Sequence, residues 1–429
     1  MKVTRMFRNV LAAGVLIASL AACGGGGNST TAGGSTTVAG TAATGKPIAN
    51  ATITLRDGSG NTKTATSDAN GKYSVDVTGL TPPYLLKVST VDGTLYGVAT
   101  QSGTANLHQF ANLIIRNWYK VQGKDLDAEY IKSGAVSVPT KSEVDTIEAV
   151  IRQIISTWLQ AKGVDATSFN LLNSAFDANS SGFDSVLDVL KVKISNGSMN
   201  IVPVDPTTGV EADPISTLPD NASLSSSQLD AAKDGINQTT TSWKNTINSK
   251  GMSTTVNDLL PIYADAATYL NAGMNVSDDI ADTLSASNHP GTITAATVKE
   301  IIKYDAVSKI VTANATFTTS NWGTGTIPLY FVYDSVGQKW LFYGDQRIAH
   351  VKALISNGKV TLSVSDPTSS VTGVTASGPG LDGTQPLTLL NGKFTLTINY
   401  SPAALSVYSF TLTKSGGTSV TYKVIASQS

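Results

Sequence analysis

Apolar and polar residues alternate along residues 51–55, 73–77 and 84–88, which is the period of a β-strand with one buried face. Stretches rich in Asp, Asn and Gly lie between these segments and are typical of tight turns. Short strands that follow one another at this spacing indicate two packed layers of sheet. The pattern therefore predicts a β-sandwich over residues 36–102.

The apolar period lengthens to that of a helix from about residue 107. Residues 107–119 and 144–159 each carry an apolar stripe at helical spacing. Thr140 and Glu143 precede the second stripe in the arrangement of a capping box, in which each side chain satisfies a backbone N–H at the start of a helix. The pattern predicts a helical connector over residues 103–202.

A linker rich in Pro, Asp and Ser is predicted over residues 203–224, and a region of mixed pattern follows it. Helical spacing comes first in this region, and strand-like alternation comes after it. The expected helices are residues 225–247, 256–270 and 294–307, and the expected strands are residues 313–319, 326–333 and 339–343. Helices followed by antiparallel strands indicate an α+β domain, here over residues 225–350.

Strict alternation returns in four segments of residues 351–429, with turn sequences at residues 378–380 and 391–392. This predicts an immunoglobulin-like β-sandwich. The predicted fold class is thus multi-domain, mainly β with α+β. Its order is an N-terminal β-sandwich, a helical connector, an α+β domain and a C-terminal immunoglobulin-like β-sandwich.

The start of the chain has a charged segment, an apolar run and then the only cysteine. Three basic residues precede the apolar residues 10–22, and this run is too short to span a bilayer as a helix. These features predict an export signal over residues 1–22. A flexible tether rich in Gly, Ser and Thr is expected over residues 23–44.

The sequence Leu20-Ala21-Ala22-Cys23 resembles the lipobox of bacterial lipoproteins. The resemblance implies cleavage before Cys23, a thioether lipid on its sulfur and acylation of its new amine, so the membrane is a partner through this anchor. Because residue 24 is Gly rather than Asp, the resemblance further implies the outer membrane of a Gram-negative bacterium. The alternative is an ordinary secretory signal that happens to end in cysteine.

Two further segments resemble known domain families. Residues 45–53, followed by residues 67–73, are similar to the carboxypeptidase regulatory-like family of transthyretin-like β-sandwiches, which implies a small accessory domain over residues 36–102 and not the peptidase itself. Residues 259–273, together with residues 330–345, resemble nuclear-transport-factor-2-like (NTF2-like) domains. That resemblance implies a curved sheet wrapped around helices, often with a conical pocket.

Composition narrows the possible functions. The chain has 429 residues and a formal net charge of −1, so it lacks the basic field that would attract nucleic acid. One cysteine excludes an internal disulfide and a cysteine-ligated zinc site, and the three histidines lie in separate segments without metal-ligand spacing. The sequence has neither a nucleophile elbow nor a phosphate-binding loop nor a dinucleotide fingerprint. We therefore expect no enzymatic activity.

One segment matches several positions of a calcium-binding loop. The candidate ligands at loop positions 1, 3, 5 and 12 are Asp177, Asn179, Ser181 and Asp188. Asp188, however, replaces the usual bidentate Glu, and Asp184 stands where an aliphatic residue is usual. The alternative, which we favour, is a turn in which Ser181 or Asp184 caps a short helix, without a cofactor.

A candidate ligand pocket lies near the end of the predicted α+β domain. Aromatic and hydrogen-bonding residues cluster there by sequence, namely Tyr330, Trp340, Tyr343, Asp345 and Arg347. Alternation places Trp340 and Phe342 on one face, so a solid aromatic core with a surface Asp–Arg pair is the alternative. Trp322, in a Gly-rich connection between strands, either folds back on the sheet or meets a partner.

Together these observations favour a lipid-anchored, non-catalytic protein of the cell envelope. Its β-modules would serve adhesion, carbohydrate contact or assembly with other envelope proteins. The alternative is a small-molecule binder, or a weak hydrolase or isomerase, that uses residues 225–350. An enclosed cavity lined by Tyr, Asp and Arg would favour the alternative, and a solid aromatic core would favour the first hypothesis.

Overall fold

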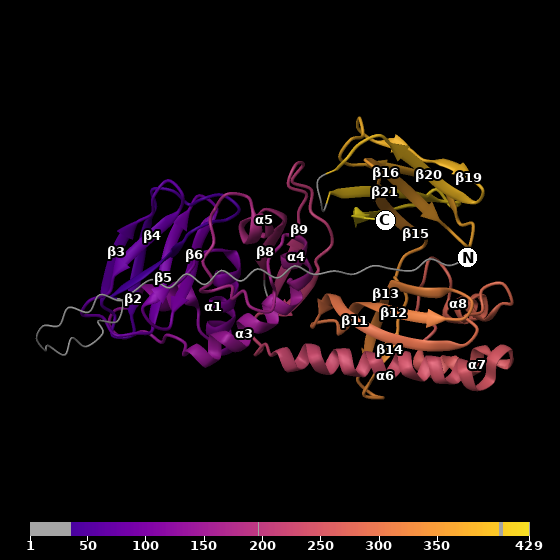
Figure 1. Ribbon diagram of the computed structural model, residues 1–429, viewed down its shortest axis with the longest axis horizontal. Helices are drawn as coiled ribbons and strands as arrows, with labels where there is room; N and C mark the ends of the chain where they lie inside the picture. The colour runs from indigo at the N-terminus through magenta and orange to yellow at the C-terminus, as the bar shows by residue number, and fades with distance from the viewer. Residues whose placement is uncertain (1–35, 196, 403–405, 429) are drawn as a thin grey trace, which may run out of the picture. The chain divides into compact units, whose positions relative to one another are not determined.

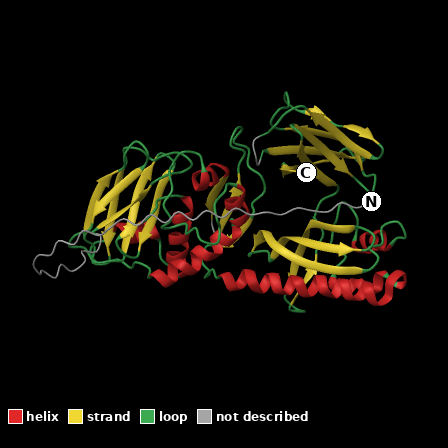
Figure 2. Ribbon diagram, in the orientation of Figure 1, coloured by secondary structure: helices red, strands yellow, loops and turns green. Residues whose placement is uncertain are grey.

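A computed structural model describes residues 36–195, 197–402 and 406–428 (Figure 1). Strand residues outnumber helical residues and form several sheets, so the protein is β-rich and consistent with several domains, as predicted. Helices lie in the central part of the chain, and strands dominate both ends (Figure 2). Cys23, the predicted signal and most of the predicted tether lie outside the described residues. Within those residues, no helix is long and apolar enough to cross a membrane.

The N-terminal region consists of two sheets with strand orders β3-β2-β5-β6 and β4-β1-β7. The strands are β1 (Thr37–Thr41), β2 (Thr52–Asp57), β3 (Thr62–Thr66), β4 (Lys72–Asp76), β5 (Tyr84–Thr90), β6 (Gly93–Ala99) and β7 (Gly103–Thr104). Ile53, Leu55, Val75, Leu86 and Val88 are buried together in one core. The strand alternation predicted for this region is confirmed.

Five helices follow, and the two predicted from the apolar stripes are among them. They are α1 (Gln109–Val121), α2 (Leu126–Ile131), α3 (Lys141–Ile154), α4 (Ser156–Ala161) and α5 (Gly182–Val189). The capping box at the start of α3 is present, because Thr140 and Glu143 each accept a hydrogen bond from the other's backbone N–H. The second apolar stripe is divided between α3 and α4, which meet at Ile155.

A seven-stranded sheet has the order β14-β13-β12-β11-β10-β9-β8. Its strands are β8 (Leu190–Ser195), β9 (Ser198–Pro203), β10 (Ser216–Pro219), β11 (Ile293–Asp305), β12 (Ile310–Thr319), β13 (Gly323–Asp334) and β14 (Lys339–Phe342). The first three come from segments that were predicted as connector and linker. Because β10 pairs in parallel with β11, opposite Ser216 and Tyr304, the sheet continues across residue 224.

Helix α6 (Ser226–Lys250) lies along one face of this sheet, which we call the inner face (Figure 1). A capping box starts this helix, because Ser225 and Gln228 satisfy each other's backbone N–H groups. The buried positions of α6 follow helical spacing and include Leu229, Ala232, Ile236, Trp243 and Ile247. Helix α6 therefore covers the inner face with a single apolar stripe.

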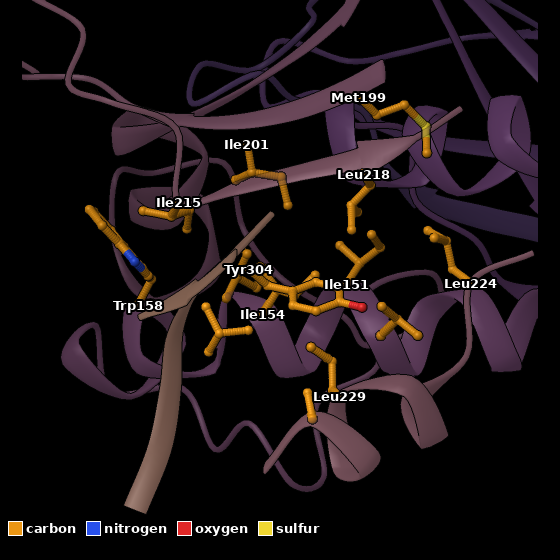
Figure 3. Close-up of a cluster of buried hydrophobic side chains, with 14 of the residues drawn as sticks. Ile151, Ile154, Trp158, Met199, Ile201, Ile215, Leu218, Leu224, Leu229 and Tyr304 are labelled. Carbon is orange, nitrogen blue, oxygen red and sulfur yellow. The ribbon is translucent and has the colours of Figure 1, made fainter. Parts of the chain in front are cut away.

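One end of the inner face, which we call the filled end, is packed with buried apolar side chains (Figure 3). Side chains from α3, α4, β9, β10, β11 and α6 meet there: Ile151, Ile154, Trp158, Ile201, Ile215, Leu218, Leu229 and Tyr304. All of them are less than one-tenth exposed. The helical region and the sheet thus share one core.

The helix predicted over residues 294–307 was wrong, because this segment forms β11. Residues with β-branched side chains are frequent in it, and they favour strands. Three shifts of register against β12 interrupt its alternation, so apolar residues such as Val298 and Ile301 fall at a spacing that resembles a helix.

The helix predicted over residues 256–270 was wrong beyond its first turn. Helix α7 (Val256–Leu259) passes into a 3₁₀ turn, η2 (Leu260–Ile262), and Tyr263 then forms a bridge with Phe342 of β14. Pro261 explains the break, because proline lacks an N–H and its ring clashes with the preceding turn of a helix. A further helix, α8 (Val276–Leu284), follows.

The C-terminal region also consists of two sheets, with strand orders β19-β20-β16-β15-β23 and β18-β17-β21-β22. The strands are β15 (His350–Ser356), β16 (Lys359–Ser365), β17 (Val371–Ser377), β18 (Gln385–Pro386), β19 (Thr388–Leu390), β20 (Lys393–Ile398), β21 (Val407–Lys414), β22 (Ser419–Ile425) and β23 (Ser427–Gln428). The four predicted alternating segments lie in β16, β20, β21 and β22, and their apolar residues pack in one core. The predicted strand alternation of these four segments is confirmed.

Candidate functional site

The other end of the inner face, which we call the hollow end, borders a cavity of about 670 Å³, which residues of β15, β22 and β23 in the C-terminal region also line. Seven aromatic side chains line it, namely Trp243, Tyr263, Tyr269, Phe317, Trp322, Tyr330 and Phe342. The ring centroids of Tyr263 and Phe342 lie 4.9 Å apart, and those of Trp243 and Phe317 lie 5.5 Å apart. The rings contact one another along the wall and leave open space beside them, as in pockets that bind small organic molecules.

The register of the sheet explains which β13 side chains reach this cavity from the inner face, and Tyr330 lines it as well from the opposite face. Phe331 of β13 lies opposite Phe342 of β14, and side chains two residues apart point to the same face. Leu329 and Ile327 therefore continue the inner face toward the cavity, which both of them line. Strand β14 pairs only with Phe331–Asp334, so in the described part of the chain no strand covers the edge of β13 before Tyr330. Ile327 is accordingly 47% exposed.

A polar cluster of Tyr269, Asn271, Asp279, Asp345 and His350 lines the same cavity. The Tyr269 hydroxyl donates to Asp279 Oδ2, and Asn271 Nδ2 donates to Asp279 Oδ1 over 2.9 Å. His350 Nδ1 lies 3.4 Å from Asp345 Oδ2. Burial raises the pKa of the Asp279 carboxyl, although the hydrogen bonds from Tyr269 and Asn271 oppose this rise.

A glycine in a left-handed conformation brings Asp345 into the polar cluster. Gly344 has a φ of +76°, and a Cβ built on it would lie 2.2 Å from the carbonyl oxygen of Leu270. Only glycine permits this close approach of the two chain segments. Asp345 Oδ1 can then accept a hydrogen bond from the backbone N–H of Ala272 over 3.0 Å. The turn thereby fixes a carboxylate at the cavity wall.

The cavity includes four of the six residues predicted for a ligand pocket: Trp322, Tyr330, Asp345 and Arg347. Burial raises the pKa of the Tyr330 hydroxyl, and the nearby Arg347 guanidinium opposes that rise. Trp340 lies on the inner face, as alternation predicted, but it lines a separate groove of about 970 Å³ beside α6. Tyr343 lines neither space; its backbone N–H donates to the carbonyl of Tyr330.

Trp322 folds back on the sheet and yet remains 48% exposed. Its Nε1 donates to the carbonyl of Asn288 over 2.9 Å, and its ring centroid lies 6.4 Å from that of Trp243. The ring thus lies beside Trp243 of α6 and the Asn288 carbonyl, while about half of it stays exposed. The exposed part of the ring lies at the border of the cavity.

Several cavity residues were missed by the sequence analysis. Trp243 and Tyr263 fell on apolar stripes at helical spacing, and such stripes predict core residues equally well. Tyr269 and Asp279 had no local signal at all, because they meet only when α8 and the segment after Pro261 come together. The aromatic content of the 259–273 segment was the one available clue.

The residues of the predicted calcium loop have separate partners. Asp177 pairs with Lys72 over 2.7 Å, and Asn179 accepts from the backbone N–H and the hydroxyl of Ser181. A Cβ built on Gly45 would lie 2.3 Å from Asp188 Oδ1, so Asp188 packs closely against that glycine. Within the described residues, no group of three or more His, Cys, Asp or Glu side chains is arranged to hold a metal ion.

Two of the three histidines lie away from the cavity. His108 is fully buried and caps α1, because its Nδ1 accepts from the backbone N–H of Ala111. Its Nε2 lies 2.7 Å from the carbonyl of Leu171, and burial lowers the pKa of His108 to about 4. His289 is buried beside Gly251. Only His350 contributes to the cavity.

Comparisons with protein families, with characterised proteins and with solved structures found no match for this chain.

Proposed function

We propose that this chain is a lipid-anchored protein of the cell envelope that binds a small organic molecule in the cavity at the hollow end. The cavity carries the proposal: it joins an aromatic wall to a polar cluster and to Arg347, within one space of about 670 Å³. That size falls in the range of small-molecule sites. Between the two hypotheses raised by the sequence, a cavity lined by Tyr, Asp and Arg supports the small-molecule binder.

Binding without chemical turnover fits the polar cluster best. Both oxygens of Asp279 already accept hydrogen bonds from Tyr269 and Asn271. Asp345 Oδ1 accepts from two backbone N–H groups, those of Ala272 and Arg347. Carboxylates whose oxygens already accept hydrogen bonds from protein groups can position a ligand but are poor at taking a proton from a substrate.

The proposed location of the protein at the cell envelope rests on the lipobox resemblance at Cys23 and on the predicted tether that follows it. A long flexible segment between a lipid and the first strand would let the folded region stand clear of the headgroups. The NTF2-like resemblance of residues 225–350 agrees with a curved sheet that holds a pocket. Fractionation of cells that express the chain or its Cys23→Ala variant tests the anchor: we expect the native chain with membranes and the variant with the soluble fraction.

The binding proposal is tested by tryptophan fluorescence of the full chain, because Trp243 and Trp322 both line the cavity. A library of small aromatic and aliphatic compounds should contain some that change the emission saturably. Thr283→Phe introduces a ring into the cavity and should weaken binding of those compounds at least about tenfold, which is about 1.4 kcal/mol. Thr241→Phe, at an exposed position of α6 outside the cavity, is the matched control and should leave binding unchanged. Equal binding by both variants would show that the compounds bind elsewhere.

A further inference from the structure

We propose that the ligand of this cavity carries a carboxylate, held by Arg347, on an aromatic or aliphatic body that lies along the rings of the hollow end. The inference rests on the proposed function and specifies its ligand class. It is drawn from the unused hydrogen-bonding capacity of the cavity wall.

Arg347 differs from the other arginines in the described residues. Arg56 donates to three backbone carbonyls, and Arg116 and Arg152 each bind a carboxylate. The Arg347 guanidinium, in contrast, has neither a hydrogen bond nor an ion pair within the described chain. It lies over the ring of Tyr422, whose centroid is 5.4 Å from its guanidinium carbon. Five N–H donors therefore stand at the cavity wall without a protein acceptor.

The stack on Tyr422 prepares this guanidinium for a ligand. The Tyr422 hydroxyl accepts from the backbone N–H of Ile348 over 3.0 Å, which fixes the ring beside the Arg347 side chain. A guanidinium whose carbon lies over an aromatic ring can still offer an N–H edge, and such an edge matches the two oxygens of a carboxylate. A lysine ammonium would provide the charge without this planar fit.

The charges around the cavity also allow an anion, because its acidic groups are already engaged. Asp279 and Asp345 each accept at least two hydrogen bonds from protein donors, and Asp345 also lies beside His350. Lys352, a second cation at the cavity wall, has no carboxylate partner among the described residues. Arg347 and Lys352 are thus the charged groups of the cavity wall that can still pair with a charged ligand.

The remaining wall selects the rest of the ligand. Trp243, Phe317, Leu329 and Phe342 present rings and an aliphatic side chain to the same space. A small charged ligand without an apolar part would leave these rings and the aliphatic side chain in contact with water. A ligand with an apolar part would bury them. The expected ligand is therefore an amphipathic acid.

Matched acids and amides test this inference on the full chain. The probes are 2-naphthoate with 2-naphthamide and decanoate with decanamide, measured by isothermal titration calorimetry. We expect at least one acid to bind about tenfold or more tightly than its amide. Arg347→Gln should abolish that preference, and Arg347→Lys should retain only part of it because the charge remains but the planar edge is lost.

Lys309→Gln is the matched control, because it removes one positive charge beside Tyr333 and outside this cavity. It should leave the preference for the acid intact. Thermal unfolding of each variant shows whether it is folded, and Arg347→Lys keeps the test valid if Arg347→Gln is not. The inference is wrong if no acid binds more tightly than its amide, or if Arg347→Gln and Lys309→Gln behave alike. Binding of both members of a pair with equal affinity would overturn the carboxylate but leave the proposed small-molecule site in place.

Discussion

The two ends of one sheet face have opposite character in this protein. At the filled end, aliphatic side chains from α3, β9, β10 and α6 interdigitate around Tyr304 (Figure 3). At the hollow end, aromatic rings such as Phe317 and Phe342 line a cavity of about 670 Å³. Helix α6 takes part in both, through Leu229 at the filled end and Trp243 at the hollow end, whereas the strands differ: β9, β10 and β11 at the filled end, and β12, β13 and β14 at the hollow end.

The difference lies in what covers the face beside α6. Helix α3 supplies a continuous apolar stripe to the filled end. At the hollow end, Pro261 stops α7 after a single turn, and irregular chain carries Tyr263 and Tyr269 to the sheet instead. A rigid helix can fill the grooves between side chains, whereas large rings on an irregular segment leave space beside them. From this comparison we expect the filled end to contribute more to stability, and the hollow end to provide the proposed binding site.

The largest expected effect is on stability at the filled end. Ile151→Ala removes a fully buried side chain and should lower the free energy of unfolding by about 3 to 4 kcal/mol. Ile327→Ala, the matched change at the hollow end, removes a side chain that is 47% exposed and should cost less than about 1 kcal/mol. Urea unfolding followed by circular dichroism measures both. Equal losses would contradict the division of roles.

The next effect is a pH dependence of stability that arises at His108, the residue that caps α1. Burial lowers the pKa of His108 to about 4 from an ordinary value of 6.5, so the unfolded chain binds more protons between these two values. This stability is present above pH 6.5 and is lost as the pH falls to about 4, by about 3 kcal/mol in total. Thermal unfolding of the native chain between pH 7 and pH 4 should show the loss, and His108→Asn, a capping residue that does not titrate there, should flatten it.

At the hollow end, the pH dependence of stability should have the opposite sign. Burial raises the pKa of Asp279, so its protonated form is favoured in the folded chain. Its contribution to stability is present below the ordinary carboxyl pKa of 3.8 and is lost as the pH rises toward the higher folded value. Acid should therefore weaken the region around His108 before it weakens the polar cluster, which hydrogen exchange at pH 5 can resolve. Earlier exchange at α8 than at α1 would contradict this order.

Much of the fold could be predicted from periodicity, because strands such as β4 alternate between buried and more exposed residues. The capping boxes at Thr140 and Ser225 were equally readable, since they depend on residues three positions apart. Strand β11 was not, because its register shifts give apolar residues a helix-like spacing. Strand β10 was not predicted either, because its segment is rich in Pro and Ser and has no local strand pattern. Its pairing with β11 and β9 makes it a strand.

The site was predictable only in part, and the reason is physical. Tyr330, Asp345 and Arg347 were found because they lie close together in sequence and mix aromatic and charged groups. Trp340 shares these features but packs beside α6, because alternation fixes its face and says nothing of its depth along the strand. Asp279 reaches the cavity from a separate helix, α8. The cavity itself forms because segments distant in sequence pack incompletely, and no local sequence pattern predicts this.

The smallest expected effect concerns Trp322, at the border of the cavity. Trp322→Phe removes the hydrogen bond from Nε1 to the carbonyl of Asn288 and should cost about 0.5 to 1 kcal/mol, because the ring is 48% exposed and the freed carbonyl can bind water. Trp322→Ala also removes a wall of the cavity, and for a ligand that contacts this ring the affinity should fall severalfold while the stability changes by about 1 kcal/mol more. Calorimetry with the best-binding probe, beside urea unfolding of both variants, separates the two effects. A large loss of stability with unchanged affinity would mean that Trp322 supports the sheet as a filled-end residue does, and that the hollow end is less tolerant than its exposure indicates.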